Sequence, residues 1–248
     1  MKLSDRLLMI AGNIEKGESA DDIGTDHGFL PLYLWENKIS PKVVFADISP
    51  GSLQKAKDTC KEFYPDETFD FRLGNGLDVL ERGEVDAITI AGMGGLLMCE
   101  MLDWDMEKSI SFKKYVLQPR NNPGKLRQYL AGRGFVIEKD QLVREGKFIC
   151  EILTVKSPDS SASTHIETSY DDFAFAEFPD MILENETELL VEYLEMHLKK
   201  QRHIKQRIIS GRGFSCHPVE DEELRAVRLR TERLEKLLAQ VKGENNEY

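Results

Sequence analysis

The sequence lacks long apolar runs and closely spaced cysteines, and each absence argues against a class of protein. Its longest stretch without a charged residue, 87–99, has 13 residues, whereas a helix that spans a bilayer needs about 20. Four cysteines without CxxC spacing and five scattered histidines match neither a zinc site nor a disulfide framework. Polar and acidic residues follow the first methionine at once, so we expect no signal peptide. These absences predict a cytoplasmic protein without a metal or a membrane span.

Basic residues are missing from one segment and concentrated in the next. Residues 157–196 carry 11 acidic and no basic side chains, whereas residues 197–242 carry 12 basic and 6 acidic ones. The whole 248-residue chain has a net charge of −11, which argues against unselective nucleic-acid binding. The asymmetry nevertheless permits a local basic face near the C-terminus. The alternative interpretation of the basic segment is a solvated helix surface.

The first 156 residues alternate short apolar runs with helical patterns, and helices are expected near Pro31, after Ser49, after Gly95 and over 123–132. The predicted strands are 20–23, 42–46, 69–73, 85–90, 115–117, 135–142 and 148–155. Strands that alternate with helices form a mostly parallel sheet covered on both faces. No helix separates the last two runs, so they predict an antiparallel hairpin at the sheet edge. The predicted fold class is α/β, with a doubly wound sheet of seven strands.

The last third of the chain shows no strand signal. Residues 157–172 are polar and contain proline, which predicts a linker. Beyond it, apolar residues recur on a helical face as far as Ile208, and a break follows at 211–218. The next helix has a seam with steps of three and four, formed by Leu224, Val227, Thr231, Leu234, Leu238 and Val241. Such a seam predicts an antiparallel coiled-coil hairpin, so the expected division is 1–156, 157–172 and 173–248.

A polar loop that contains two glycines follows the first predicted strand. It runs from Asp22 through Gly24, Asp26 and His27 to Gly28. Glycines at a strand end allow a sharp turn and the close approach of a ligand. The carboxylates repel phosphate but suit a cation, so the loop fits the ammonium and sulfonium groups of S-adenosylmethionine. The alternative is a tight turn with surface aspartates.

The second and third predicted strands also end in polar residues. Asp47 follows the second strand, and its spacing from Gly28 is typical of a carboxylate that binds a ribose. An aspartate before a helix is equally an ordinary cap. Asn75 and Gly76 follow the third strand, where the Asn75 amide would face an adenine. Asn-Gly is also a common turn dipeptide.

Two further loops complete the pattern. Residues 91–95, Ala-Gly-Met-Gly-Gly, follow the fourth strand, and residues 117–123, Leu-Gln-Pro-Arg-Asn-Asn-Pro, end the fifth. All five segments stand at the carboxyl ends of consecutive parallel strands, which is the edge where open α/β sheets bind ligands. Their coincidence in order predicts a small-molecule site at this edge.

These segments resemble the bacterial TrmK family, whose members methylate N1 of adenine 22 in tRNA. The resemblance rests on residues 22–31 (DIGTDHGFLP), 46–48 (ADI), 74–77 (GNGL), 91–95 (AGMGG) and 117–119 (LQP). It covers the whole chain, because that family joins a class I, Rossmann-like methyltransferase domain to a helical coiled-coil arm. The resemblance implies S-adenosylmethionine as the cofactor and tRNA as the partner.

The resemblance and the loop chemistry together assign roles to individual residues. The residues expected to bind the donor are Asp22, Gly24, Asp26, Gly28, Asp47, Ile48, Asn75, Gly76, Ala91, Gly92, Met93 and Gly94. The residues expected to contact the tRNA are Phe29, Tyr33, Gln118, Arg120, Asn121, Lys199, Lys200, Arg202 and Lys205. For the two aromatic residues, the alternative is a place in the hydrophobic core.

The sequence departs from the family pattern at two positions. Asp21 stands where the first strand usually carries a small apolar residue, which weakens the prediction of that strand. Arg120 separates Gln118-Pro119 from Asn121, where family members run directly into asparagine. The insertion shifts the expected substrate contact from Asn121 toward Arg120, as a base-stacking or phosphate-binding residue.

The reaction needs alignment more than acid–base help, because the N1 lone pair lies in the ring plane and is mostly unprotonated at neutral pH. A carboxylate or carbonyl near the exocyclic amine would hold the base and offset the positive charge that forms on the ring. Asp26 is the first catalytic candidate, followed by His27 and the carbonyl groups of Ala91 or Gly92. Because N1 lies on the pairing edge, a paired adenine must first be extruded.

Two other functions fit parts of the pattern. A methyltransferase with another RNA or a small-molecule substrate would use the same strand-end loops, but it would leave the basic C-terminal segment without a role. A binding or scaffold protein with a vestigial cofactor fold would dimerise through its coiled coil. The intact glycines and carboxylates at every strand end argue against the scaffold. The expected assembly is a monomer or a weak dimer.

Overall fold

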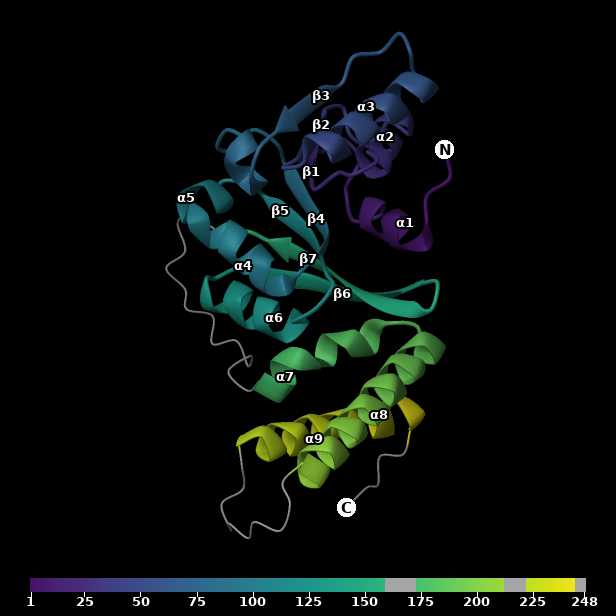
Figure 1. The fold of residues 1–248 in the computed structure, drawn as a ribbon, viewed down its shortest axis with the longest axis vertical. Coiled ribbons are helices and arrows are strands. Elements are labelled where there is room, and N and C mark those ends of the chain that lie inside the picture. The colour runs from purple at the N-terminus through teal and green to yellow at the C-terminus, as the bar shows by residue number, and fades with distance from the viewer. Residues whose placement is uncertain (159–172, 212–221, 244–248) are drawn as a thin grey trace.

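The computed structural model describes residues 1–158, 173–211 and 222–243. Within these ranges seven strands form one sheet in the order β3-β2-β1-β4-β5-β7-β6 (Figure 1). The strands are β1 (Ala20–Ile23), β2 (Val43–Asp47), β3 (Asp70–Leu73), β4 (Ala87–Met93), β5 (Lys114–Pro119), β6 (Val136–Glu145) and β7 (Phe148–Lys156). The first five are parallel, and β7 runs antiparallel to both β5 and β6. The predicted sheet with its terminal hairpin is confirmed.

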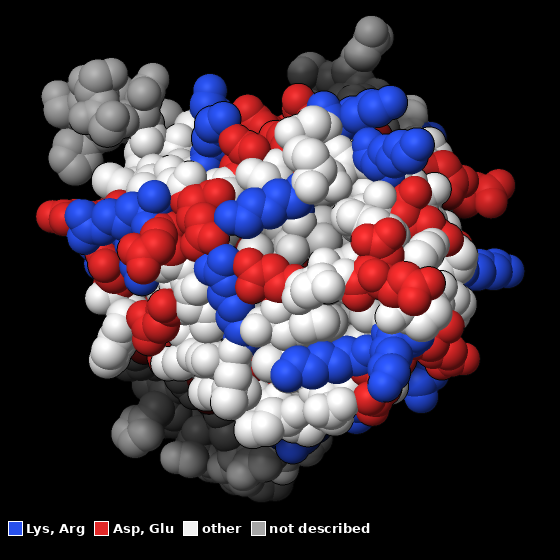
Figure 2. Space-filling view, turned by 90° about the horizontal axis from the view of Figure 1, so that it is seen from above, with Lys and Arg blue, Asp and Glu red and all other residues white. Residues whose placement is uncertain are grey.

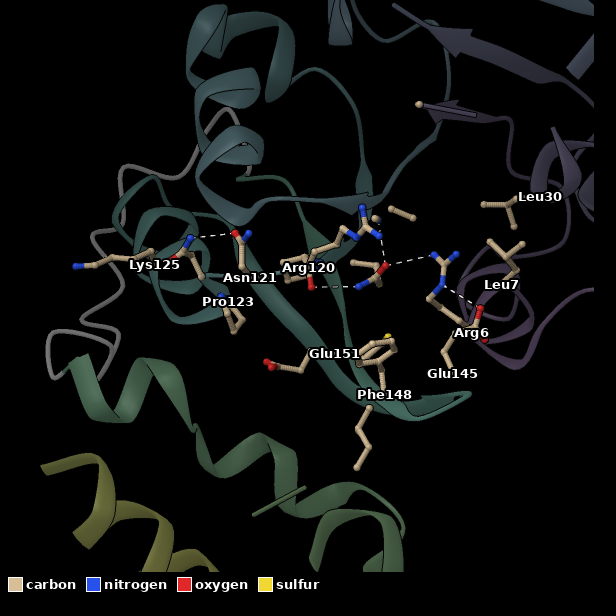
Figure 3. Close-up of a pocket in the computed structure, with 18 of the residues that line it drawn as sticks. Arg6, Leu7, Leu30, Arg120, Asn121, Pro123, Lys125, Glu145, Phe148 and Glu151 are labelled. Atoms are coloured by element: carbon tan, nitrogen blue, oxygen red, sulfur yellow. Dashed lines mark hydrogen bonds and ion pairs between the residues drawn. The ribbon is translucent and has the colours of Figure 1, made fainter. Parts of the chain in front are cut away.

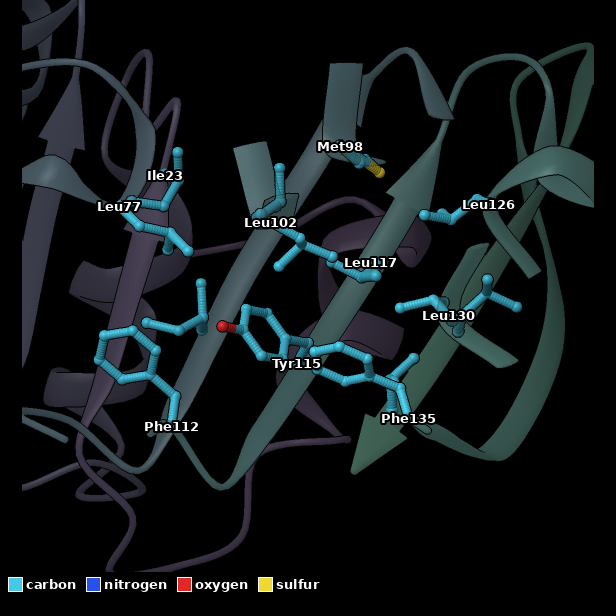
Figure 4. Packing of buried hydrophobic residues seen from close by; sticks show 14 of the residues in the cluster. Ile23, Leu77, Met98, Leu102, Phe112, Tyr115, Leu117, Leu126, Leu130 and Phe135 are labelled. Atoms are coloured by element: carbon cyan, nitrogen blue, oxygen red, sulfur yellow. The ribbon is translucent and has the colours of Figure 1, made fainter. Parts of the chain in front are cut away.

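Helices cover both faces of the sheet, as Figure 1 shows. The helices before the arm are α1 (Asp5–Ala11), α2 (Phe29–Glu36), α3 (Pro50–Phe63), α4 (Gly95–Trp104), α5 (Met106–Ser109) and α6 (Pro123–Gly132). One core cluster joins α1, α2 and α3 to one face of the sheet. The other joins α4 and α6 to the opposite face, where Leu102 and Leu130 pack against Tyr115 and Leu117 of β5 (Figure 4). Both clusters consist of buried apolar side chains, whose removal from water stabilises the fold.

The chain before β1 forms a helix that no sequence pattern predicted. Ser4 caps α1, and its Oγ accepts a hydrogen bond from the Leu7 amide 3.4 Å away. Ile10 and Ala11 are buried, and the helix contacts α2 as well as the β6–β7 hairpin. α1 therefore packs against the sheet and its helices, and it brings Arg6 of its first turn to Gln118 at the carboxyl end of β5.

Asp21 lies inside β1 and not at its end. The strand has the predicted bounds, so the expectation that Asp21 weakens it is wrong for the backbone. The side chain is 1% exposed, and neither carboxylate oxygen has a hydrogen-bond partner among the described residues. Burial, followed by the neighbouring charge of Asp22, raises the pKa of Asp21 well above its usual value.

The C-terminal arm consists of α7 (Phe173–Glu177), a 3₁₀ turn (Asp180–Glu184), α8 (Thr187–Gly211) and α9 (Glu222–Lys242). The two long helices pack against each other, as the predicted hairpin requires, although its coiled-coil geometry stays a prediction. Of the predicted seam on α9, Val227 and Leu234 are buried. Most of the predicted linker, 159–172, and the predicted break after residue 211 lie outside the described residues.

The arm is docked on the sheet edge through a third apolar cluster. Leu142 of β6 packs there with Phe178, Leu194 and Leu234 of the arm. The ring of His197 in α8 lies 4.4 Å from the Tyr193 ring, measured between ring centroids. Burial lowers the pKa of His197 to about 4, so it packs as a neutral aromatic ring at neutral pH.

A buried ionic network joins the arm to the sheet next to that cluster. Arg127 of α6 is fully buried and bridges Asp140 of β6 at 2.8 Å and Glu151 of β7 at 2.5 Å. From the arm, the Tyr193 hydroxyl donates to Glu151 at 2.9 Å, and the Ala176 carbonyl accepts from Arg127 at 3.1 Å. The division of the chain at residue 156 stays a prediction, and these contacts show that the two parts share a buried interface.

In the described ranges, no helix is long and apolar enough to cross a membrane. The same ranges contain no group of three or more histidine, cysteine, aspartate or glutamate residues arranged to hold a metal ion.

Candidate active site

A cleft of about 1160 Å³ opens between the carboxyl edge of the sheet and the arm. Figure 3 shows how side chains from α1, the β5 end and the β6–β7 hairpin enter it. The predicted site residues that line this cleft are Asp22, Gly24, Asp26, His27, Phe29, Ala91, Gly92, Gln118, Arg120, Asn121 and Lys200. The structure therefore brings together residues from the ends of β1, β4 and β5 and one residue from the arm.

Other predicted residues lie outside this cleft. Asp47, Ile48, Asn75 and Gly76 stand at the ends of β2 and β3, beyond the β1 loop. Among the predicted residues outside the lining are also Gly28, Met93, Gly94, Tyr33, Lys199, Arg202 and Lys205. Tyr33 packs against the apolar cluster beneath α2, so the alternative interpretation, a core residue, describes its position.

The loop after β1 needs its glycines because neighbouring side chains touch it. Gly24 has a φ of +79°, and a Cβ there would lie 2.3 Å from the Met93 Cε atom. Gly28 has a φ of +71°, and its Cβ would lie 3.0 Å from both Phe45 and Ala56. A side chain at either position would be strained by the positive φ. One at Gly28 would also crowd Phe45 and Ala56, whereas the flexible Met93 side chain can move away from one at Gly24. The loop is thus pressed against β2 on one side and the β4 end on the other.

Asp22 is a buried carboxylate at the deep end of the cleft. The Thr89 hydroxyl donates to its Oδ1 at 2.8 Å. Burial raises the pKa of Asp22, while hydrogen bonds from Thr89 and Thr25 and the nearby charge of Arg6 oppose that rise. A desolvated carboxylate of this kind gains most from a bound cation, which matches the ammonium group expected here.

Asp47 connects two neighbouring loops at the end of β2. Its Oδ1 accepts from the Ser49 amide at 2.8 Å, and its Oδ2 accepts from the Asp26 amide at 3.3 Å. The residue that caps α3 is Ser49, whose Oγ accepts from the Ser52 amide. The helix-cap interpretation therefore belongs to Ser49, and the Asp47 carboxylate holds the β1 loop while standing where a ribose is expected.

Asp26 and His27 form an exposed pair at the rim of the cleft. Asp26 is in the left-handed backbone region, with a φ of 45°, and its Oδ1 accepts from Lys55 of α3 at 3.0 Å. Its Oδ2 lies 3.7 Å from His27 Nε2. The His27 ring stacks on Phe29 with 5.5 Å between centroids and 6° between planes. The two predicted catalytic side chains are thus neighbours, and Phe29 lies beside them.

The fourth strand continues further than predicted. β4 includes Ala91, Gly92 and Met93, and its pairing with β5 shifts register between Ala91 and Met93. Gly92 has a φ of +75°, and its amide donates to Gln118 Oε1 at 3.0 Å. The segment that the sequence predicted as a loop is therefore an irregular strand end whose shape depends on Gln118.

Gln118 lines the cleft and also holds neighbouring parts of the site in place. Its side chain is 3% exposed, and Arg6 of α1 donates to the same Oε1 at 3.3 Å. Arg6 also pairs with Glu145 of β6 at 3.5 Å, as Figure 3 shows. The Asn121 carbonyl also accepts a hydrogen bond from the Gly95 amide at 3.0 Å, which joins the end of β5 to the start of α4.

Sequence analysis missed several residues that line the cleft. Arg6 comes from α1, Phe148 from β7, Lys125 from α6 and Arg230 from α9. The Phe148 side chain is 61% exposed, and Figure 3 places it at the centre of the cleft. None of these residues belongs to a strand-end motif. Only Arg230 had a sequence signal, which is the basic character of residues 197–242. Tertiary packing, which residue spacing does not reveal, brings the other three to the cleft.

Charge on one face of the molecule is mixed. On the face seen in Figure 2, basic and acidic side chains alternate without a continuous basic surface. Of the four basic arm residues predicted to contact tRNA, Lys200 lines the cleft, and Arg202 lies 3.8 Å from Glu235. The basic side chains that line the cleft therefore come from several elements, and they are Arg6, Arg120, Lys125, Lys200 and Arg230.

The fold and the strand-end site define a methyltransferase of the Rossmann-like class. Residues 3–153 match the family model described as a methyltransferase domain. A solved structure of a protein in the NADB-Rossmann superfamily from Streptococcus agalactiae is 28% identical, with a TM-score of 0.80, and the alignment covers 96% of this chain and 98% of that one.

Two further comparisons specify the family. The chain is 31% identical over 163 residues to the tRNA (adenine(22)-N(1))-methyltransferase of Bacillus subtilis (strain 168), covering 66% of this chain and 68% of that protein. M. capricolum TrmK, solved with S-adenosyl-homocysteine, has the same fold at 21% identity, with a TM-score of 0.72 over 97% of this chain and 99% of that one. The chain belongs to the TrmK family, and the resemblance noted in the sequence is confirmed.

Proposed function

We propose that this protein transfers the methyl group of S-adenosylmethionine to N1 of adenine 22 in tRNA. The observation that carries the proposal is the cleft itself. Asp22, the Gly92 strand end and Asp26 face one space with the arm, in a chain whose curated relative is named for this reaction. The arm supports a macromolecular substrate, because a small molecule would need only the strand-end loops.

The residues present fit the donor. A buried carboxylate at Asp22 suits its ammonium group, and Gly92, which lines the cleft, leaves open space because no described atom lies within 4 Å of a Cβ built there. Asp47 stands at the end of β2, where it would accept both ribose hydroxyls. Ile48 and Leu73, exposed apolar side chains at the ends of β2 and β3, would flank the adenine near Asn75. The donor supplies a methyl group on a positively charged sulfur.

The chain supplies alignment and charge. The Gly92 strand end, held by Gln118, would place backbone groups beside the reacting nitrogen, and Phe29 and Phe148 would pack against the extruded base. The Asp26 carboxylate would accept a hydrogen bond from the exocyclic amine and offset the charge developing on the ring. Orientation of the base and the donor in the cleft accounts for most of the expected acceleration.

The test is an incubation of the purified chain with unmodified tRNA and isotopically labelled donor, followed by digestion and mass spectrometry of the nucleosides. The expected product is labelled 1-methyladenosine. Another methylated nucleoside, or transfer to a small molecule only, would favour the alternative substrates and overturn this proposal.

The proposal includes a cytoplasmic monomer or weak dimer. Sedimentation at several protein concentrations is expected to give a monomer mass at micromolar concentration, and a stable dimer would contradict this part.

A further inference from the structure

Three basic side chains from three helices meet on the arm side of the cleft. Lys125 of α6, Lys200 of α8 and Arg230 of α9 all line it. Lys125 Nζ lies 4.9 Å from the centroid of the Phe173 ring, and the Arg230 guanidinium carbon lies 4.3 Å from the same centroid. One aromatic ring therefore contacts two cations that line the same cleft, and both would gain from an added anion.

These three cations lack the ion pairs that neighbouring basic residues have. Arg233, one turn after Arg230, pairs with Asp180 at 2.9 Å, and Lys242 pairs with Glu195 at 3.0 Å. Within the described ranges no salt bridge is formed by Lys125, Lys200 or Arg230. Arg230 is half-buried, and desolvation lowers its pKa from the usual value. Its charge is thus kept in the cleft without a direct partner.

One carboxylate stands among them. Glu177 of α7 is close enough to Arg230, Lys200 and Arg127 for their charges to act on it, yet burial and the nearby Glu151 raise its pKa. Arg127 is already committed to Asp140 and Glu151. Among the described residues on this side of the cleft, the cations Lys125, Lys200 and Arg230 therefore outnumber the one poorly solvated acid that stands among them.

We propose that Lys125, Lys200 and Arg230 bind the phosphodiester backbone of the tRNA strand that carries the target adenine. The proposal deepens the proposed function and rests on it. The three cations share the cleft with Asp26 and Gly92, so a strand whose base reaches the strand ends must pass them. Lysine and arginine recognise phosphates by charge and fix register without reading sequence.

The test uses the full chain and a triple variant, Lys125→Gln, Lys200→Gln and Arg230→Gln. We expect its tRNA affinity to fall about tenfold or more, and the slope of log affinity against log salt to shrink by roughly 0.7–0.9 per lost contact. Donor affinity, measured by calorimetry, stays unchanged. The matched control replaces three exposed basic residues outside the cleft, Lys61, Arg225 and Lys236, with glutamine. It removes the same charge and should leave most of the salt slope intact.

Two further variants keep the test decisive if the triple variant is unstable. Arg230→Lys retains the charge and should retain the salt slope. Glu177→Gln removes the competing negative charge and should tighten tRNA binding several-fold. Equal slopes for the triple variant and its control, or weaker binding by Glu177→Gln, would overturn the proposal. If tRNA binds through the triad but is not methylated, the proposed function fails while this site stands.

Discussion

The Asp47 carboxylate is expected to bind the ribose of the donor, and it also accepts a hydrogen bond from the Asp26 amide. Because Ser49 caps α3, a substitution of Asp47 tests these two roles without removing the cap. Asp47→Ala removes the charged acceptor for the ribose and also releases the Asp26 amide. Charge-assisted hydrogen bonds contribute about 1.5–3 kcal/mol each, so we expect donor affinity to fall at least tenfold in calorimetry. Ser49→Ala is the control, because it removes the α3 cap and leaves the carboxylate in place. Unchanged donor affinity for Asp47→Ala would refute the ribose assignment.

For Asp26, an effect on the rate of methyl transfer has to be distinguished from an effect on the fold and on binding. Asp26→Asn keeps the shape but removes the charge, so we expect the turnover number to fall well beyond about threefold, roughly 0.7 kcal/mol in activation free energy, while the fold persists. The substitution also breaks the ion pair with Lys55, and Lys55→Met is therefore the control. Turnover close to wild type for Asp26→Asn would move the role to His27 or to backbone carbonyls.

The buried carboxyl group of Asp21 predicts how the free energy of unfolding depends on pH. Its folded-state pKa is raised by burial, so the unfolded chain loses this proton at a lower pH than the native protein does. The native state therefore loses stability as pH rises from about 4 until the folded pKa is passed. Asp21→Asn does not titrate, and its free energy of unfolding relative to wild type should increase over that window. Denaturant unfolding at several pH values measures this difference, and a difference that shrinks with rising pH would contradict it.

At the scale of elements, the arm and the sheet are linked by a network that sequence patterns did not reveal. Tyr193→Phe removes one hydroxyl and leaves the buried Glu151 with an unmet acceptor. We expect a loss of about 1–3 kcal/mol, seen as a lower midpoint of thermal unfolding. Tyr129→Phe is a comparison, because that hydroxyl contacts Asp103 at an exposed position and its loss should cost less. Equal costs would mean that Glu151 is satisfied in another way.

Sequence patterns predicted the elements that depend on local periodicity. All seven strands and the glycine loops follow from alternating apolar runs and turn residues, and β1 has the predicted bounds. No helix was predicted over 5–11, and the burial of its residues depends on contacts with α2 and the β6–β7 hairpin, which are distant in sequence. The β4 end was taken as a loop because three glycines disfavour a strand, yet Gln118 fixes its amide. Arg6, Phe148 and Arg230 reach the cleft only through tertiary packing.

At the scale of the whole molecule, an acidic protein can bind the proposed RNA substrate because several basic side chains line the cleft. The net charge of −11 lowers unselective binding, while Arg120, Lys125, Lys200 and Arg230 converge on one cleft. Contacts with phosphate then form only where the target base enters the site. The sequence predicted the basic character of residues 197–242 and a phosphate contact at Arg120, but it did not predict that Lys125 and Arg230 line the same cleft.

The most direct test of the account is to map the methyl group on a defined tRNA. Two transcripts, one with adenine at nucleotide 22 and one with guanine there, are incubated with the protein and donor. The modified nucleotide is then identified by nuclease fragmentation and mass spectrometry. We predict one 1-methyladenosine, at nucleotide 22 of the first transcript, and none in the transcript with guanine. Methylation of both transcripts at another nucleotide, or of neither, would contradict the account.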